Sequence, residues 1–258
     1  MIGERMAQVL TLLQSQLREG SGSIADISDL GVRALDVDGL TVSLTAEDGS
    51  AEPVWCSDEA ARRFEDLQFT LGQGPGPEAL RGGVRVLVPD LAQVWRQRWP
   101  ELSREAPGLA TRAVFCFPMG IRAVPVGVLT ALRRTPGPLT DEQVEDAQVL
   151  AHALTARALG SGGLGGKGMG GGVSGVGTAV PVDSRQALHH AVIHQATGMV
   201  SVQLDLSLPQ ALLRLRAHAF GTGRSITDIS RDVVERRLRL DDTYGNGNGT
   251  PMPVPEKD

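Results

Sequence analysis

Arginine is the residue type whose number and spacing could do chemistry in this chain, and it gathers near the C-terminus. Residues 184–240 contain eight arginines, no lysine and four acidic residues, so this segment has a net charge of +4. The whole chain has a net charge of −5, which leaves −9 for the other residues. A guanidinium group can bind a phosphate through two donors or stack on an unpaired base. The segment therefore suits a polyanionic partner, although a solvated helix face would have a similar charge.

The other reactive residue types form no catalytic or metal-binding pattern. Cys56 and Cys116 lie in apolar stretches without a neighbouring basic group, which is typical of small buried hydrophobic side chains. No cluster of histidine, cysteine and acidic residues has the spacing of a metal or haem site, and no nucleophile can be paired with a base. We therefore expect no enzyme activity, no catalytic residue, no metal and no cofactor.

A glycine-rich stretch, Gly160–Val180, separates two parts of the chain and has 11 glycines in 21 residues. It differs from a phosphate-binding loop, because Lys167 is followed by Gly168 where that loop needs serine or threonine. We predict a flexible linker at residues 159–183. Residues 241–258 are rich in glycine, asparagine and proline and are expected to form a disordered tail.

The part before the linker mixes helical and strand periodicity. Strand pairs that follow one another, with helices at both ends, indicate an antiparallel sheet covered by helices. We predict an N-terminal helix at residues 1–19 and an α+β domain at 20–158. Further helices are expected at Ile24–Ala34, at Asp58–Phe69 and, after a Thr140–Gln143 capping box, through Ala158, and strands at Gly39–Thr45, Glu52–Cys56, Val84–Val88, Ala113–Phe117 and Val126–Arg133.

The part after the linker reads as an all-α domain of three helices over residues 184–240. The first is expected at Ser184–Gln203, with Val202 on its apolar side. The second begins at a Ser207–Gln210 capping box and ends at two glycines. The third is expected at Ser225–Leu240, with arginines near its end, where cations suit the helix dipole.

Residues 20–158 resemble a GAF domain of the kind found in actinobacterial regulators. The matching stretches are Gln68–Gly76 (QFTLGQGPG), Val88–Leu91, Arg98–Pro100, Phe117–Met119, Gly127–Leu129 and Pro138–Thr140. The resemblance implies a small-molecule pocket between the sheet and its covering loops. The candidate lining residues are Gln68, Gly72, Gly74, Asp90, Trp99 and Phe117. The alternative is that the glycines serve tight turns and Trp99 fills the core.

Residues 184–240 resemble an ANTAR domain, which is an RNA-binding antiterminator module. The matching stretches are Ile193–Met199 (IHQATGM), Leu208–Leu212 (LPQAL), Leu215–Arg216, Ala219 and Arg224–Ser230 (RSITDIS). The resemblance implies RNA binding by Gln195, Ala196, Thr197, Gly198, Arg216 and Arg224. Thr197 stands where this family usually has lysine, so one phosphate contact is lost.

The two resemblances together imply a bacterial transcription antitermination regulator, in which a GAF sensor with an unknown small-molecule ligand controls an ANTAR output domain. The ANTAR domain would bind RNA stem-loops of nascent transcripts. The sequence does not decide whether the protein forms a homodimer. The alternative is a small-molecule sensor whose helical domain binds a protein partner or DNA. We expect a cytoplasmic protein without a membrane segment, because apolar runs such as Val124–Leu132 are much shorter than a membrane span.

Overall fold

The computed structural model describes residues 2–19, 24–46, 49–105, 108–122, 124–160 and 184–240. The chain divides into two compact units, residues 1–191 and 192–258. Most of the predicted linker at 159–183 and the whole predicted tail at 241–258 lie outside the described residues. No helix within the described ranges is long and apolar enough to cross a membrane.

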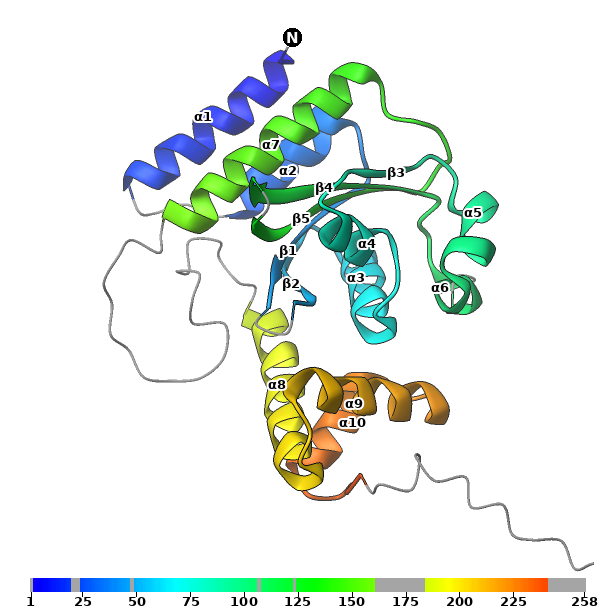
Figure 1. Cartoon of the computed structure of the whole chain (residues 1–258). Coiled ribbons are helices and arrows are strands. Elements are labelled where there is room, and N and C mark those ends of the chain that lie inside the picture. Colours follow the sequence, from blue (N-terminus) through cyan, green and yellow to red (C-terminus); the bar gives the residue numbers. More distant parts are fainter. Residues whose placement is uncertain are drawn as a thin grey trace, which may run out of the picture. The chain divides into compact units, whose positions relative to one another are not determined.

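The first unit is built on an antiparallel sheet with the strand order β2-β1-β5-β4-β3 (Figure 1). The expected strand pairs are confirmed, with longer central strands than predicted. The strands are β1 (Gly39–Thr45), β2 (Ala51–Cys56), β3 (Val86–Val88), β4 (Ala113–Ile121) and β5 (Val124–Arg133). Side chains alternate between the two faces of each strand, so the register decides which residues share a face.

Helices cover both faces of this sheet (Figure 1). One face packs against α1 (Glu4–Glu19), α2 (Ile24–Leu35) and α7 (Asp141–Gly160). The core on the other face includes side chains from α3 (Glu59–Leu71), α4 (Pro75–Gly82), α5 (Leu91–Arg98) and α6 (Pro100–Glu105). We call this second side the α3–α6 face. Every second residue of the central strands is therefore buried on each side.

The three short helices α4, α5 and α6 were not predicted from the sequence. Prolines and glycines at their starts read as loops, but a proline in the first turn of a helix gives up no intrahelical hydrogen bond. The capping box predicted before α7 is confirmed. The Thr140 amide donates to Gln143 Oε1 at 2.9 Å, and the Gln143 amide donates to Thr140 Oγ1 at 3.2 Å.

The N-terminal helix α1 belongs to the core of the first unit. Met6, Val9 and Leu13 are at most 2% exposed and pack in the same cluster as α2 and α7. The Gly3 amide also donates to Oδ1 of the buried Asp146 on α7 at 3.1 Å. This helix is thus part of the layer that covers the sheet.

Residues 184–240, the described part after the predicted linker, form three helices: α8 (Ser184–Leu204), α9 (Leu208–Thr222) and α10 (Ile226–Val234). The Ser207–Gln210 pair does begin α9, since the Ser207 amide donates to Gln210 Oε1 at 3.0 Å. Val202 was expected on the apolar side of α8, but it is 86% exposed. The buried side of α8 carries Ile193, Ala196 and Val200 instead.

The third helix ends six residues earlier than predicted. Arg236 has a left-handed backbone with φ of 58°, and the amides of Arg237 and Leu238 both donate to the Asp232 carbonyl. The chain then turns back, so that Leu240 is buried and its carbonyl accepts a hydrogen bond from Gln203 Nε2 at 2.5 Å. The arginines after Val234 therefore do not belong to the last turn of α10.

Burial of α1 leads to a prediction on stability. Replacing Leu13 with alanine should lower the free energy of unfolding of the first unit by about 2–5 kcal/mol, because a buried leucine leaves a cavity. Chemical denaturation of the full chain measures this loss. Gln14→Ala is the control, since Gln14 is exposed on the same helix and should change little. Equal stability of the two variants would show that α1 does not contribute to the core.

Candidate functional site

A buried set of polar side chains lies between the sheet and helices α3 and α4. Glu65 on α3 is 3% exposed and accepts hydrogen bonds from Thr41 Oγ1 at 2.5 Å and Gln68 Nε2 at 3.0 Å. Gln68 Oε1 in turn accepts from the Gly76 amide at 2.9 Å. We call Thr41, Glu65, Gln68 and Gly76 the Glu65 network. It connects β1, α3 and the start of α4 through side-chain hydrogen bonds.

The strand register extends this polar region across the sheet. Thr41 on β1 pairs with Thr130 on β5, and Thr130 pairs with Cys116 on β4. All three side chains are completely buried, and the Cys116 thiol lies 3.7 Å from Thr130 Oγ1. A polar row thus crosses the three central strands beneath Glu65.

Local backbone geometry puts Gln68 in place. Gly72 ends α3 in a left-handed conformation with φ of 64°, and Gly74 precedes α4 with φ of 137°. A Cβ atom added at Gly74 would come within 2.8 Å of Gln68 Cγ. Glycine at position 74 therefore supplies both the required backbone conformation and the space that the Gln68 side chain fills.

Burial changes the acid–base behaviour of this region. It raises the pKa of the Glu65 carboxyl, and the hydrogen bonds from Thr41, Thr130 and Gln68 offset only part of that rise. It also raises the pKa of the Cys116 thiol, with the charge of Glu65 acting in the same direction. The region therefore favours neutral groups, which donate and accept hydrogen bonds without a desolvated charge.

Ser43 adds an unused hydrogen-bonding group to the same face. It lies two residues after Thr41 on β1 and opposite Val128, which belongs to the core of the α3–α6 face. It is 1% exposed, and its Oγ has no hydrogen-bond partner among the residues that the structure describes. A buried hydroxyl without a partner is costly, and such groups in proteins call for a specific explanation.

The structure brings some predicted pocket residues together and separates others. Gln68, Gly72 and Gly74 lie together at the turn between α3 and α4. Trp99 is also on the α3–α6 face, but Phe117 belongs to the core on the opposite face. Because strand side chains alternate, the neighbouring Cys116 takes the position on the α3–α6 face that was expected of Phe117.

Asp90 and Trp99 both have structural partners. Asp90 accepts a hydrogen bond from the Ala92 amide at 3.1 Å and pairs with Arg112 at 3.2 Å, so it holds the start of α5. Trp99 is 3% exposed, and its Nε1 donates to Glu78 Oε2 on α4 at 3.1 Å. The burial of Trp99 fits the alternative in which it fills the core, and Asp90 also has a structural role.

Thr41, Ser43 and Glu65 were missed by the sequence analysis. The signal for the first two is in β1 itself, whose sequence GLTVSLT alternates apolar and hydroxyl side chains. That alternation predicts a strand but does not by itself show that both of its faces are covered. When both faces of the strand are covered, the hydroxyl side faces other protein groups and marks a polar interior.

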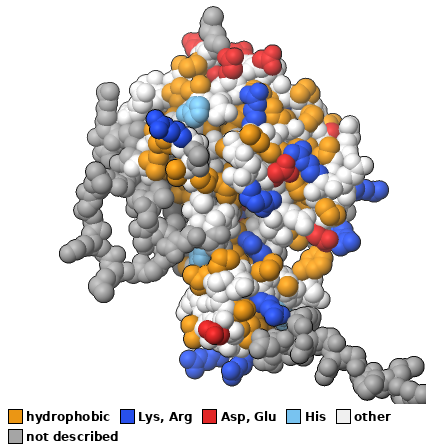
Figure 2. Space-filling view, viewed as in Figure 1, with side chains coloured by type: hydrophobic (Ala, Val, Ile, Leu, Met, Phe, Trp, Pro, Cys, Tyr) orange, Lys and Arg blue, Asp and Glu red, His pale blue; other side chains and the backbone are white. Residues whose placement is uncertain are grey.

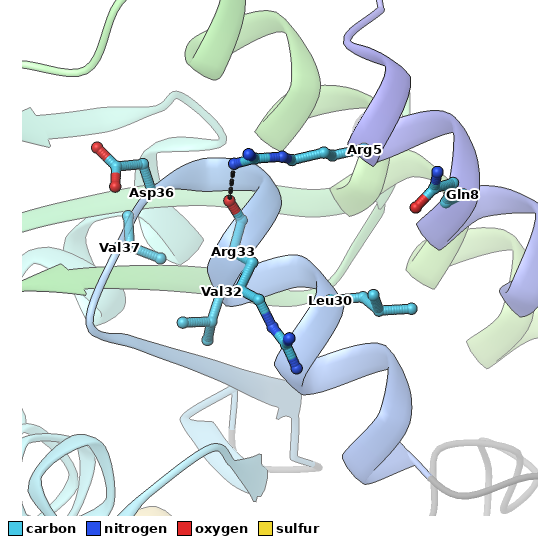
Figure 3. Close-up of a pocket in the computed structure, with 7 residues that line it drawn as sticks. All are labelled: Arg5, Gln8, Leu30, Val32, Arg33, Asp36 and Val37. Carbon is cyan, nitrogen blue, oxygen red and sulfur yellow. Dashed lines mark hydrogen bonds between the residues drawn. The ribbon is translucent and has the colours of Figure 1, made fainter.

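Two surface grooves lie elsewhere in the first unit. One, of about 450 Å³, lies between α1 and α2 and is lined by Arg5, Gln8, Leu30, Val32, Arg33, Asp36 and Val37 (Figure 3). The other, of about 380 Å³, is at the start of α3 and includes Asp58, Arg63 and Arg134. Neither groove contains a predicted pocket residue or a member of the Glu65 network. Within the described residues no group of three or more histidine, cysteine or acidic side chains could hold a metal ion.

The predicted RNA-binding residues differ in exposure. Ala196 and Thr197 are buried, and Thr197 Oγ1 donates to the Ile193 carbonyl at 2.7 Å. Their side chains face the packed side of α8. Gln195 is exposed, and Gly198 is partly exposed, with open space where a Cβ atom would be. On other elements, Arg216 is half-buried on α9, and Arg224 is exposed just before α10.

Arg224 takes part in an ion-pair cluster at the end of α10. Its guanidinium donates to Asp232 Oδ2 at 2.6 Å, although 47% of its side chain is exposed. Asp232 also accepts from Arg237 at 2.9 Å. Arg224 thus has an intramolecular role as well as an exposed surface that a ligand could contact.

Comparison with known proteins identifies a family for the first unit. The family model described as GAF domain matches residues 24–157. Among solved structures, the chain resembles the GAF domain of an Acinetobacter phosphoenolpyruvate-protein phosphotransferase, with 14% identity, a TM-score of 0.47, and 63% of this chain and 96% of that chain covered. The corresponding GAF domain from Coxiella burnetii has 16% identity, a TM-score of 0.44, and coverages of 59% and 91%. No curated protein matches the chain.

The raised pKa of Glu65 leads to a prediction on pH dependence. The native state binds the Glu65 proton more tightly than the unfolded state, so its contribution to stability is lost as pH rises from the ordinary value of 4.5 through the native pKa. Glu65→Gln should remove this loss and flatten the stability curve above pH 4.5. Denaturant titrations at several pH values measure the effect.

The exposed Glu59 provides the control for this experiment. Hydrogen bonding to Arg62 lowers the pKa of Glu59, so any contribution it makes has the opposite pH dependence. Glu59→Gln should leave the loss of stability with rising pH intact. If Glu65→Gln and the parent have parallel curves, Glu65 is not held in its neutral form.

Proposed function

The chain belongs to the GAF domain family, and on this basis we propose that its first unit senses a small polar molecule and controls the helices that follow. The ligand is expected on the α3–α6 face, where the Glu65 network and Ser43 offer neutral hydrogen-bonding groups in a buried place. The protein acts by binding rather than by catalysis. A signalling role follows from such an arrangement, because a ligand that binds one state shifts the population toward it.

The observation that carries this proposal is the buried Ser43 hydroxyl, for which the described part of the chain offers no hydrogen-bond partner. A buried hydroxyl that served only packing would be replaced by alanine or valine without loss, whereas a ligand-binding hydroxyl needs a partner that arrives with the ligand. Glu65 and Gln68 lie on the same face and already exchange hydrogen bonds with protein groups. A ligand that offers both donors and acceptors could replace those bonds.

For the C-terminal helices we propose RNA stem-loops as the partner, and transcription antitermination as the output. This rests on the resemblance of residues 184–240 to an ANTAR domain and on their net positive charge. RNA loops present unstacked bases that a protein can read. Gln195, Gly198, Arg216 and Arg224 are the candidate contacts, while Ala196 and Thr197 pack within the fold. Binding by a homodimer to two hairpins would add avidity.

Ser43→Ala tests the sensing proposal. In the free protein this change should leave the melting temperature unchanged or higher, because it removes an unsatisfied buried hydroxyl. A panel of amino acids, nucleobases and small organic acids is screened by thermal denaturation of the full chain. A compound that raises the melting temperature of the parent should bind Ser43→Ala several-fold more weakly, as expected when one hydrogen bond is lost.

Thr11→Ala is the matched control, since the Thr11 hydroxyl donates to the Ala7 carbonyl within α1, on the other side of the sheet. It should leave ligand binding unchanged. A compound that stabilises the parent and Ser43→Ala equally would place the ligand site away from this face.

A pair of variants tests the RNA proposal. A hairpin RNA is selected from a randomised-loop library by binding to the full chain, and its affinity is measured at several salt concentrations. Arg224→Gln should weaken binding and reduce the salt slope by about one if the guanidinium contacts a phosphate. Asp232→Asn releases the Arg224 guanidinium and should keep the affinity of the parent.

The two variants separate binding from stability. If Arg224 serves only its ion pair, both changes lower stability alike and neither alters the affinity of the folded protein. Duplex DNA of equal length provides the comparison for the alternative function, and stronger binding of the parent to that DNA would contradict an RNA partner.

A further inference from the structure

Helix α9 has an exposed apolar side in addition to its buried one. Its buried side carries Ala211, Leu212, Leu215 and Ala219. On the other side Leu213 is 63% exposed and Phe220 is 49% exposed. Residues seven apart lie on nearly the same side of a helix, about 10 Å from each other along its axis. The half-buried Arg216 lies between them in sequence, three residues after Leu213 and four before Phe220.

The chain directly beyond Phe220 carries little side-chain bulk. Two glycines, Gly221 and Gly223, follow it, and a Cβ atom added at either would meet no atom within 4 Å. The amide of Arg224 donates to the Ala219 carbonyl at 3.1 Å, which keeps Arg224 at the same end of α9 as Phe220. This end of α9 thus combines an exposed aromatic ring, two glycines and an arginine whose guanidinium is held by Asp232.

The charge of these helices indicates what could cover the ring. Residues 184–240 have a net charge of +4, and Figure 2 shows exposed hydrophobic and basic side chains next to each other on this part of the chain. Aromatic rings next to arginines are the elements with which proteins bind unpaired bases, since the ring stacks on the base and the cation attracts the phosphate.

We propose that Phe220 is a stacking platform for an unpaired base of the RNA loop, an inference that rests on the proposed RNA-binding function. Leu213 extends the apolar side, and the backbone of Arg224 is held at the end of the same helix. A second copy of the chain is a poorer occupant. Two large side chains on one helix offer much less than the roughly 1,200 Å² in total that a specific protein interface needs. A planar base matches the area of a single exposed ring.

The test uses the full chain and a hairpin RNA selected from a randomised-loop library, with 2-aminopurine placed in the loop. Phe220→Leu should weaken binding roughly tenfold to hundredfold, because one stacked base loses its aromatic partner. Phe220→Trp should retain the affinity. The salt slope should be the same for parent and Phe220→Leu, since no phosphate contact is removed. Quenching of the 2-aminopurine fluorescence on binding should be lost in Phe220→Leu only.

Val202→Ala is the matched control, because Val202 on α8 is the more exposed side chain yet lies outside this side of α9. It should bind like the parent. If the parent binds the hairpin and Phe220→Leu binds it equally well, the stacking inference is wrong while the RNA function stands. If the selection yields no RNA that the parent binds, the RNA function itself fails, and the inference with it. A change of Phe220→Leu from dimer to monomer in sedimentation, with RNA binding intact, would assign this side of α9 to a second copy.

Discussion

Because helices cover both faces of the five-stranded sheet, each polar side chain in its central strands needs a partner from the protein or from a ligand. On the face covered by α1, α2 and α7, central-strand residues such as Phe117 and Leu129 are apolar and need no hydrogen-bond partner. On the other, Thr41 meets it by bonding to Glu65, and Gln68 continues the chain of bonds to the start of α4. Side-chain hydrogen bonds thus hold part of the α3–α4 layer to the sheet. Hydrogen bonds between this layer and the sheet can be replaced by hydrogen bonds to a ligand. The apolar packing of α7 on the other face offers no hydrogen bonds to replace.

In the C-terminal helices, ion pairs between acidic residues and arginines fix the positions of the guanidinium groups. One carboxylate, Asp232, accepts from both Arg224 and Arg237, and Asp228 accepts from Arg231. The acidic residues of this region therefore order arginines instead of neutralising the segment. An arginine that is already held in one conformation loses less entropy when it binds, but its ion pair also reduces the local positive charge, so the two effects on affinity oppose each other.

Sequence periodicity was sufficient to predict most of the main helices and strands, but it did not show on which face of the sheet each side chain lies. The strand Gly39–Thr45 and the Thr140–Gln143 cap were predicted correctly because their signals are local. Phe117 was grouped with Trp99 as a candidate pocket residue, but the two lie on opposite faces of the sheet, because neighbouring residues of a strand point to opposite sides. The premature end of α10 depends on the contacts of Leu240 and Gln203, which lie 37 residues apart and leave no local pattern. For the same reason the Glu65 network could not be recognised before the strands were paired.

The two cysteines provide a way to measure how often the helices on the α3–α6 face move away from the sheet. Cys116 is completely buried in the polar row beneath Glu65, and burial raises the pKa of its thiol, so it presents almost no reactive thiolate to solvent. A thiol reagent can reach it only when the layer opens, and the rate of its modification therefore reports how often that opening occurs. Cys56, at the end of β2, is partly exposed, so a reagent can reach it without such an opening. The modification rate of Cys116 thus measures how often the covering layer opens, and the modification rate of Cys56 serves as the reference.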